Sequence, residues 1–291
     1  MNAKFNKADT TFELLVRNMN NLCDQHIFKT SWYLRDLKSG MSAHRNGNVS
    51  VTSASTRKVA ILMAALKTVK DGRFRLDQNI TIEAKYQDNN SGCFQYFTPG
   101  FSITFRDALI MMIIVSDNAC TGTIVDMLGL DYINSFCSSI GMRDTVHRHG
   151  IPPNDLPRNH NANATNTTTA RDVGILLELI VKGTKDEISA GLLGCTTNLC
   201  ELTIDILSWQ NLRDRLPAML PHGTKVANKT GTGTRDCNDV GIIFRNEEPL
   251  YILTVFSESI PANLQDETPY IYAASKLISE LSLACYNTIQ T

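Results

Sequence analysis

The chain has little of several features that would reveal a partner. It has no long hydrophobic run: the longest, Ala108 to Val115, has 8 residues, whereas a membrane-spanning helix needs about 20. It also has no excess of one charge, because 28 Lys and Arg residues face 29 Asp and Glu residues among the 291. This balance gives no reason to expect nucleic acid or an anionic membrane as a partner.

The sequence also lacks the patterns of export and of metal binding. No apolar stretch follows the basic start, Met1 to Lys7, because Asp9, Glu13 and Arg17 interrupt it, and a signal peptide needs such a stretch. The eight cysteines are scattered, so we expect buried free thiols and a cytoplasmic protein rather than a disulfide framework. No cysteines or histidines have the spacing of a zinc site, and we expect neither a metal nor a cofactor.

The hydrophobic pattern predicts a sheet from the two chain ends and helices from the middle. The elements expected at the ends are a helix over 10–23, a hairpin from 31 to beyond 41, a hairpin over 240–256 with its turn at Asn246–Pro249, and a helix over 269–286. The stretch from about 55 to 215 has an almost wholly helical pattern. We predict an α/β (α+β) fold with a cleft between two parts. These are a sheet subdomain from 1–50 and 216–291 and a mainly helical subdomain from 51–215.

Three short strings follow one another along the chain: Ser55-Thr56-Arg57-Lys58, Ser116-Asp117-Asn118 and Lys229-Thr230-Gly231. Each is weak alone, but the ordered set is specific. Apolar residues at helical spacing follow Ser55, which places this serine at a helix start with Lys58 one turn later on the same face. A serine hydroxyl attacks poorly until a base takes its proton. An amine that nearby cations keep partly neutral can act as that base.

The three strings are the signature of the class A β-lactamases and penicillin-binding proteins, and the chain resembles this superfamily over nearly its whole length. The resemblance implies an antiparallel sheet flanked by N- and C-terminal helices, with the active site in the cleft beside a helical subdomain. It also implies that Ser55 is the acylated nucleophile, that Lys58 is its base and that Ser116 relays a proton to the leaving nitrogen. Asp117 is better explained as a structural residue that accepts hydrogen bonds from local backbone N–H groups.

The resemblance assigns the remaining site residues to substrate binding. Asn118 would hold the substrate amide, and the backbone N–H groups of Ser55 and Thr232 would form the oxyanion hole. Gly231 would let the substrate approach the strand closely. The substrate carboxylate would be bound by Lys229, Thr230 and Thr232.

One part of the class A pattern is missing. In that class, a glutamate in an E-x-x-L-N string activates the water that hydrolyses the acyl-enzyme. Here no glutamate occurs between Glu83 and Glu178, and the corresponding stretch, Gly150 to Pro153, has no titratable side chain. Three alternatives remain open: Asp155 acts from a shifted loop, Lys58 serves both half-reactions, or a histidine takes the role. The candidate histidines are His147, His149 and His160.

These observations predict a serine hydrolase that cleaves an amide or β-lactam-like bond through an acyl-Ser55 intermediate. A penicillin-binding-protein-like peptidase, acyltransferase or esterase is the second hypothesis. A β-lactam sensor that turns over slowly is the third. The expected partner is a small-molecule amide, lactam or ester, and the pattern leaves the oligomeric state open. Because the loop lacks a base, we expect slow hydrolysis of ordinary penicillins.

Overall fold

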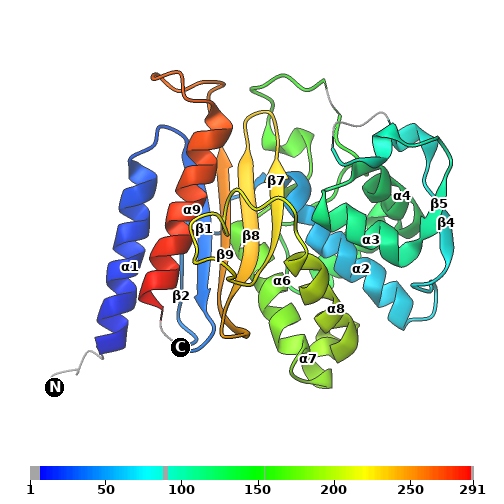
Figure 1. The fold of residues 1–291 in the computed structure, drawn as a ribbon, viewed down its shortest axis with the longest axis horizontal. Coiled ribbons are helices and arrows are strands. Elements are labelled where there is room, and N and C mark those ends of the chain that lie inside the picture. Colours follow the sequence, from blue (N-terminus) through cyan, green and yellow to red (C-terminus); the bar gives the residue numbers. More distant parts are fainter. Residues whose placement is uncertain (1–6, 88–90, 154, 290–291) are drawn as a thin grey trace.

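The structure, a computed structural model, describes residues 7–87, 91–153 and 155–289. Residues 1–6, which belong to the segment used for the export prediction, lie outside these ranges. Both chain ends contribute to one five-stranded sheet of order β2-β1-β9-β8-β7, in which all neighbours are antiparallel (Figure 1). Its strands are β1 (Lys29–Asp36), β2 (Ser42–Arg45), β7 (Val226–Thr232), β8 (Cys237–Arg245) and β9 (Glu248–Glu258).

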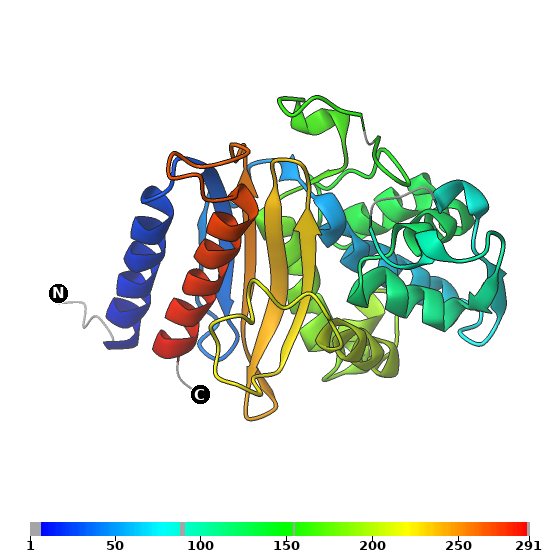
Figure 2. The same cartoon turned by 45° about the horizontal axis from the view of Figure 1, so that its top comes forward.

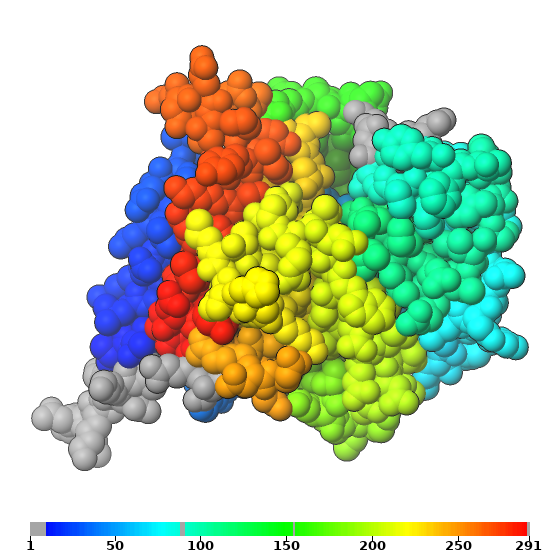
Figure 3. Space-filling view, in the orientation of Figure 1, coloured from blue at the N-terminus to red at the C-terminus, as the bar shows by residue number. Residues whose placement is uncertain are grey.

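Two terminal helices cover one face of the sheet. The N-terminal α1 (Lys7–Asp24) and the C-terminal α9 (Tyr270–Thr288) lie side by side there (Figures 1 and 2). Apolar residues from both helices form a core with the strands, and Trp32 and Tyr251 are fully buried in it. The segment before β7 closes this core with Leu216 and Leu220, and Figure 3 shows it (yellow) on the surface beside α9 (red).

The other face of the sheet packs against α6 (Ala170–Gly183), with α8 (Thr197–Ser208) beside it. A Cβ on Gly174 of α6 would come within 2.3 Å of the Tyr33 ring of β1, so this glycine permits the close approach. The part of the chain predicted to be helical therefore contributes directly to the sheet layer. The subdomain boundaries at 50/51 and 215/216 remain a prediction.

Beyond α6 lies the helical part of the molecule (Figure 1). Its central helix is α2, which is buried on nearly every side and extends from the sheet edge into this region. Two small antiparallel ladders, β3–β6 and β4–β5, were not expected from the almost wholly helical pattern. The elements of this region are α2 (Lys58–Lys70), α3 (Phe105–Ile114), α4 (Asn118–Leu128), α5 (Leu130–Ser139), α7 (Glu187–Leu192), β3 (Val51–Thr52), β4 (Asn79–Thr81), β5 (Ser102–Thr104) and β6 (Thr167–Thr168).

The turn of the C-terminal hairpin is shorter than predicted. It consists of Asn246 and Glu247 alone, with φ values of 52° and 63°. Glu248 and Pro249 already pair with Arg245 and Phe244 across the hairpin. Two-residue turns with both residues in the left-handed region match the twist of the flanking strands. This explains why the polar Asn-Glu-Glu-Pro string forms strand as well as turn.

The structure leaves all eight cysteines as free thiols, and every one except the half-buried Cys93 is buried. Burial raises their pKa values, for example those of Cys137 and Cys195 to about 12. We therefore expect native protein to react slowly with a thiol reagent, with Cys93 first, and denatured, unreduced protein to titrate close to eight thiols. Two or fewer thiols after denaturation would reveal disulfides. Among the helices of the described ranges, none is long and apolar enough to cross a membrane.

Candidate active site

A cavity of about 430 Å³ lies where four distant segments meet: the start of α2, the α3–α4 turn, the loop after α5 and the edge strand β7. The predicted site residues in its lining are Ser55, Lys58, Ser116, Asn118, Thr230 and Thr232. Lys229 and Gly231 lie behind this lining. The fold thus brings together residues from all three sequence strings. Their roles in a reaction remain predictions.

Ser55 sits on a short 3-10 turn, η1 (Ala54–Arg57), that continues directly into α2. Ala54 has a φ of 44°, in the left-handed region that costs a non-glycine residue about 1 kcal/mol or more. The carbonyl of Ser53 fixes the turn, because it accepts hydrogen bonds from the Thr56 N–H (3.1 Å) and the Thr56 hydroxyl (2.6 Å). This turn holds Ser55 at the cavity wall.

Lys58 is 1% exposed, and its Nζ faces the α3–α4 turn. It donates to the Ser116 carbonyl (2.7 Å), the Ser116 Oγ (3.1 Å) and the Asn118 Oδ1 (2.8 Å). Burial, and then the nearby cations Lys229 and Arg57, hold the pKa of Lys58 well below its ordinary value. The neutral amine is therefore far more accessible at neutral pH than that of a surface lysine.

Ser116 and Asp117 form the turn that carries the second string. Ser116 has a φ of 58°, and this left-handed conformation accompanies the contacts of its carbonyl and hydroxyl with Lys58. Asp117 is fully buried and accepts hydrogen bonds from the backbone N–H groups of Cys120 and Phe94, each at 2.9 Å. These contacts agree with the structural role expected for Asp117. A Cβ on Gly92 would lie 2.2 Å from its Oδ2, so only glycine fits there.

The third string lies on β7, and Lys229 is its most buried side chain. Lys229 is 0% exposed and its Nζ donates to the Thr230 carbonyl at 2.8 Å. Burial lowers the pKa of Lys229 to about 7, although Asp239 opposes the shift. Its ammonium therefore acts on the cavity from behind Thr230, as a nearby charge and not as a lining group.

Gly231 also meets a structural need that was not predicted. A Cβ at this position would come within 2.9 Å of the Thr56 Cγ2 and 3.1 Å of the Thr56 N. The glycine therefore makes room for the turn that carries Ser55, and not for the substrate alone. Strand β7 and η1 can be in contact only because this residue has no side chain.

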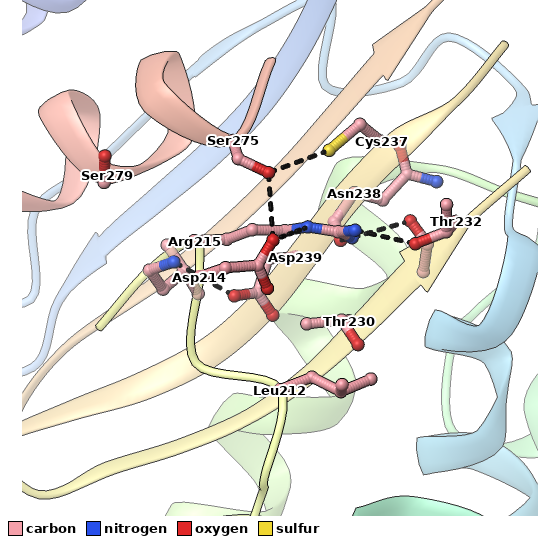
Figure 4. Close-up of polar contacts among 12 residues, drawn as sticks. Leu212, Asp214, Arg215, Thr230, Thr232, Cys237, Asn238, Asp239, Ser275 and Ser279 are labelled. Carbon is pink, nitrogen blue, oxygen red and sulfur yellow. Dashed lines mark hydrogen bonds and ion pairs between the residues drawn. The ribbon is translucent and has the colours of Figure 1, made fainter. Parts of the chain in front are cut away.

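Sequence reasoning missed Arg215, which lies in the segment before β7 and belongs to no motif. Its guanidinium is buried and donates to the carbonyls of Gly231 (2.9 Å) and Asn238 (2.6 Å) and to the Thr232 Oγ1 (2.6 Å). Figure 4 shows the side chain running across the strands toward Thr232. Because the Thr232 hydroxyl accepts from Arg215, its own proton is free to be donated to an anionic group in the cavity. Only the fold reveals this contact.

The loop that lacks the glutamate forms an apolar wall of the cavity through Ile151, Pro152 and Pro153. It is attached to the turn that carries Ser55 by Arg57, which is buried and donates to the Gly150 carbonyl. Burial lowers the pKa of Arg57 to about 10. Arg57 thus connects η1 with this loop.

The candidate bases of this region differ in their positions. His147 is buried away from the cavity beside Arg57, and burial and that cation lower its pKa to about 3. The His149 ring contacts the Ala164 carbonyl (3.1 Å) and does not line the cavity. Asp155 is exposed and also lies outside the lining. The structure therefore gives no support to Asp155 as the base, because Asp155 is not among the residues that line the cavity with Ser55. His160 does line the cavity.

Comparison with known proteins identifies the chain's relatives. Residues 14–289 match the model of the β-lactamase enzyme family. The chain belongs to this family. Among the described residues, no group of three or more His, Cys, Asp or Glu side chains could hold a metal ion.

Among the relatives of this β-lactamase-family chain, one is named as a β-lactamase and another as a carboxypeptidase. It is 26% identical over 219 residues to β-lactamase BRO-1 of Moraxella catarrhalis, covering 74% of this chain and 66% of that protein. It is 29% identical over 153 residues to the D-alanyl-D-alanine carboxypeptidase DacB2 of Mycobacterium tuberculosis, covering 50% of this chain and 48% of that protein. The matches therefore span 48% and 66% of the lengths of these two curated relatives.

A solved structure of PBP-A, a point variant in an acyl-enzyme complex with penicillin G, has 25% identity, a TM-score of 0.80 and coverage of 94% of this chain and 96% of that one. The predicted fold and the predicted superfamily are both confirmed.

Proposed function

We propose that the protein is a serine hydrolase that cleaves an amide or β-lactam-like bond through an acyl-Ser55 intermediate. Membership of the β-lactamase enzyme family supports hydrolysis of β-lactam or peptide bonds. The observation that carries the proposal is the buried Lys58 amine, with its lowered pKa, in hydrogen-bond contact with Ser116 beside the Ser55 turn. The lowered pKa favours the neutral amine, which is the form that can take the proton of a serine hydroxyl.

Acylation uses the groups around this amine. Neutral Lys58 takes the proton of the Ser55 hydroxyl, and the Ser55 Oγ attacks the substrate carbonyl carbon. The resulting oxyanion lies between the backbone N–H groups of Ser55 and Thr232. The C–N bond then breaks as the proton passes from Lys58 through the Ser116 Oγ, 3.1 Å away, to the leaving nitrogen.

Substrate binding uses β7 and its supports. A substrate carboxylate accepts hydrogen bonds from the hydroxyls of Thr230 and Thr232. The buried Arg215, and Lys229 in its charged form, strengthen this interaction from behind, because charges in a low-dielectric environment act more strongly than in water. Asn118 lines the same cavity and holds the substrate amide.

Deacylation is the slow step in this proposal. The wall at Ile151–Pro153 offers no titratable group, and the two prolines have no N–H to hold a water. Lys58 then serves both half-reactions, or His160 assists it from the cavity lining.

A second function is favoured by the same apolar wall, which lowers water access near the ester. In a peptidase or acyltransferase an amine takes the acyl group instead of water. The relative named as a carboxypeptidase agrees with this alternative. If neither water nor an amine takes the acyl group, the acyl-enzyme persists and the protein acts as a sensor.

One experiment distinguishes these functions. The protein is exposed to benzylpenicillin and its intact mass is measured over time by mass spectrometry, while nitrocefin hydrolysis is followed in parallel. An adduct that forms and decays with continued nitrocefin turnover supports the hydrolase. A persistent adduct that an added D-amino acid releases supports the acyltransferase, and one that nothing releases supports the sensor. Absence of any adduct and of any hydrolysis would refute all three.

A further inference from the structure

A buried carboxylate with one unpaired oxygen lies in the wall of the same cavity. Asp236, at the end of the loop between β7 and β8, is 1% exposed and belongs to the lining that includes Ser55. Its Oδ1 has no hydrogen-bond partner among the described residues. Buried polar groups are almost always hydrogen-bonded. Burying a carboxylate without a partner costs more folding free energy than burying an unpaired neutral polar group. This exception therefore requires an explanation.

The neighbouring charged groups do not satisfy Asp236. Arg158 and Arg235, which face it from two loops, donate to backbone carbonyls instead: Arg158 to Thr234 and Ile260, and Arg235 to His160. Within the described ranges, no cation forms an ion pair with Asp236.

Four charged or titratable groups act on the pKa of Asp236 besides burial. Burial first, and then Glu258 on β9, raise this pKa to about 6, while Arg235, His160 and Arg158 oppose the shift. The carboxyl group is thus ionised at neutral pH and protonated in mild acid.

The place of Asp236 along the cavity indicates which part of a substrate it meets. Thr230, Thr232 and Gly233 follow one another in the lining, and a Cβ on Gly233 would lie 2.7 Å from the Asp236 Oδ2. The carboxylate therefore packs against the residue that follows the oxyanion-hole position. If the leaving group lies at Ser116, the acyl substituents extend the other way, past Thr232 toward Asp236.

We propose that Asp236 recognises a positively charged amine on the acyl part of the substrate. This inference rests on the proposed function, because it takes the acyl part to be the portion held at Ser55. An ammonium group in the cavity would give the Asp236 carboxylate the cationic partner that it lacks. A substrate without the amine would leave the carboxylate unpaired, and sites that must leave a buried polar group unpaired reject such substrates strongly.

Ampicillin and benzylpenicillin test this, because they differ only by an amine on the acyl side chain. We expect the acylation rate constant of the wild-type protein to favour ampicillin by about tenfold or more, the usual value of a hydrogen bond to a charged group. Asp236→Asn should abolish the preference, whereas Asp266→Asn, an exposed carboxylate in the loop before α9, should retain it. An unchanged preference in Asp236→Asn would overturn the proposal.

The wild-type protein provides a second readout that needs no folded variant. The preference should fall as the pH is lowered from 7.5 to 5, with a midpoint near 6, because protonated Asp236 no longer attracts the amine. The amine itself stays mostly protonated over this range, since free α-amino groups have a pKa near 8. A preference that is flat from pH 7.5 to 5 would contradict the assignment.

Binding to Ser55→Ala separates this inference from the proposed function. Calorimetry with this variant measures the affinity of the two penicillins without any acylation. Tighter binding of ampicillin, lost in Ser55→Ala/Asp236→Asn, supports the recognition of the amine by Asp236. This result holds whether or not the wild-type protein opens the β-lactam ring. Equal affinity, or no binding of either compound, overturns it. Failure of wild-type protein to become labelled refutes the proposed function instead.

Discussion

Ser55→Ala is expected to abolish covalent labelling of the protein by benzylpenicillin and by any other acylating compound. The reason is that Ser55 lies at the cavity wall beside the start of α2, with the buried Lys58 one turn later. Intact-mass spectrometry after penicillin exposure checks the result, and peptide mapping of the wild-type adduct locates the ester. Ser50→Ala, an exposed serine just before β3, is the matched control and should label normally. A label that survives in Ser55→Ala would remove the assignment of the nucleophile.

Lys58→Ala should keep Ser55 in place but slow its acylation by about 10²–10⁴-fold, the usual loss when a general base is removed. The variant also leaves the Ser116 hydroxyl without its 3.1 Å contact, so proton delivery to the leaving nitrogen suffers as well. Lys70→Ala, an exposed lysine at the end of the same helix, is the control. Acylation at the wild-type rate in Lys58→Ala would show that another group activates Ser55.

A further large effect is expected in the hydrolysis of the acyl-Ser55 ester. We expect a chromogenic cephalosporin to give a burst of about one product per protein molecule, followed by a slow steady state. The apolar wall at Ile151–Pro153 supplies no base for the water, and the absence of a positioned base costs ~10²–10⁴ in rate. Stopped-flow absorbance measures both phases, and the acyl-enzyme should be visible by mass spectrometry during the steady state.

Rapid turnover without a burst would contradict this prediction and would mean that a base exists. His160→Ala is then the first variant to make, because His160 lines the cavity, and Asp155→Asn serves as its control outside the lining. A burst in His160→Ala, but not in Asp155→Asn, would identify His160 as the base.

Much of the site followed from spacing along the chain. An S-x-x-K string before an apolar helix places Ser55 and Lys58 on one face, because Ser55 lies on the 3-10 turn η1, in which residues three apart are aligned. The structural role of Asp117 was equally predictable, since an aspartate at a helix start accepts nearby backbone N–H groups. Local rules sufficed in both cases.

Other features depend on contacts between distant segments and could not be predicted in this way. Arg215 meets Thr232 only because the segment before β7 crosses the sheet face that α9 covers. Asp236 resembles any polar loop residue until the fold buries it. The need for glycine at position 231 arises from Thr56, 175 residues away in sequence (231 − 56). Their local sequences contain no signal of these partners.

The antiparallel pairing of β1 with β9 has a consequence for synthesis on the ribosome. Trp32 is opposite Val255 in this pairing, so the centre of the sheet cannot close until nearly the whole chain has emerged. Ser55 and Lys58 are made early, but β7, which contributes the other side of the cavity, follows about 170 residues later. Contacts between such distant segments form late and slowly. We therefore expect Ser55 to be unreactive in a growing chain and to become reactive only after β7 has folded against η1.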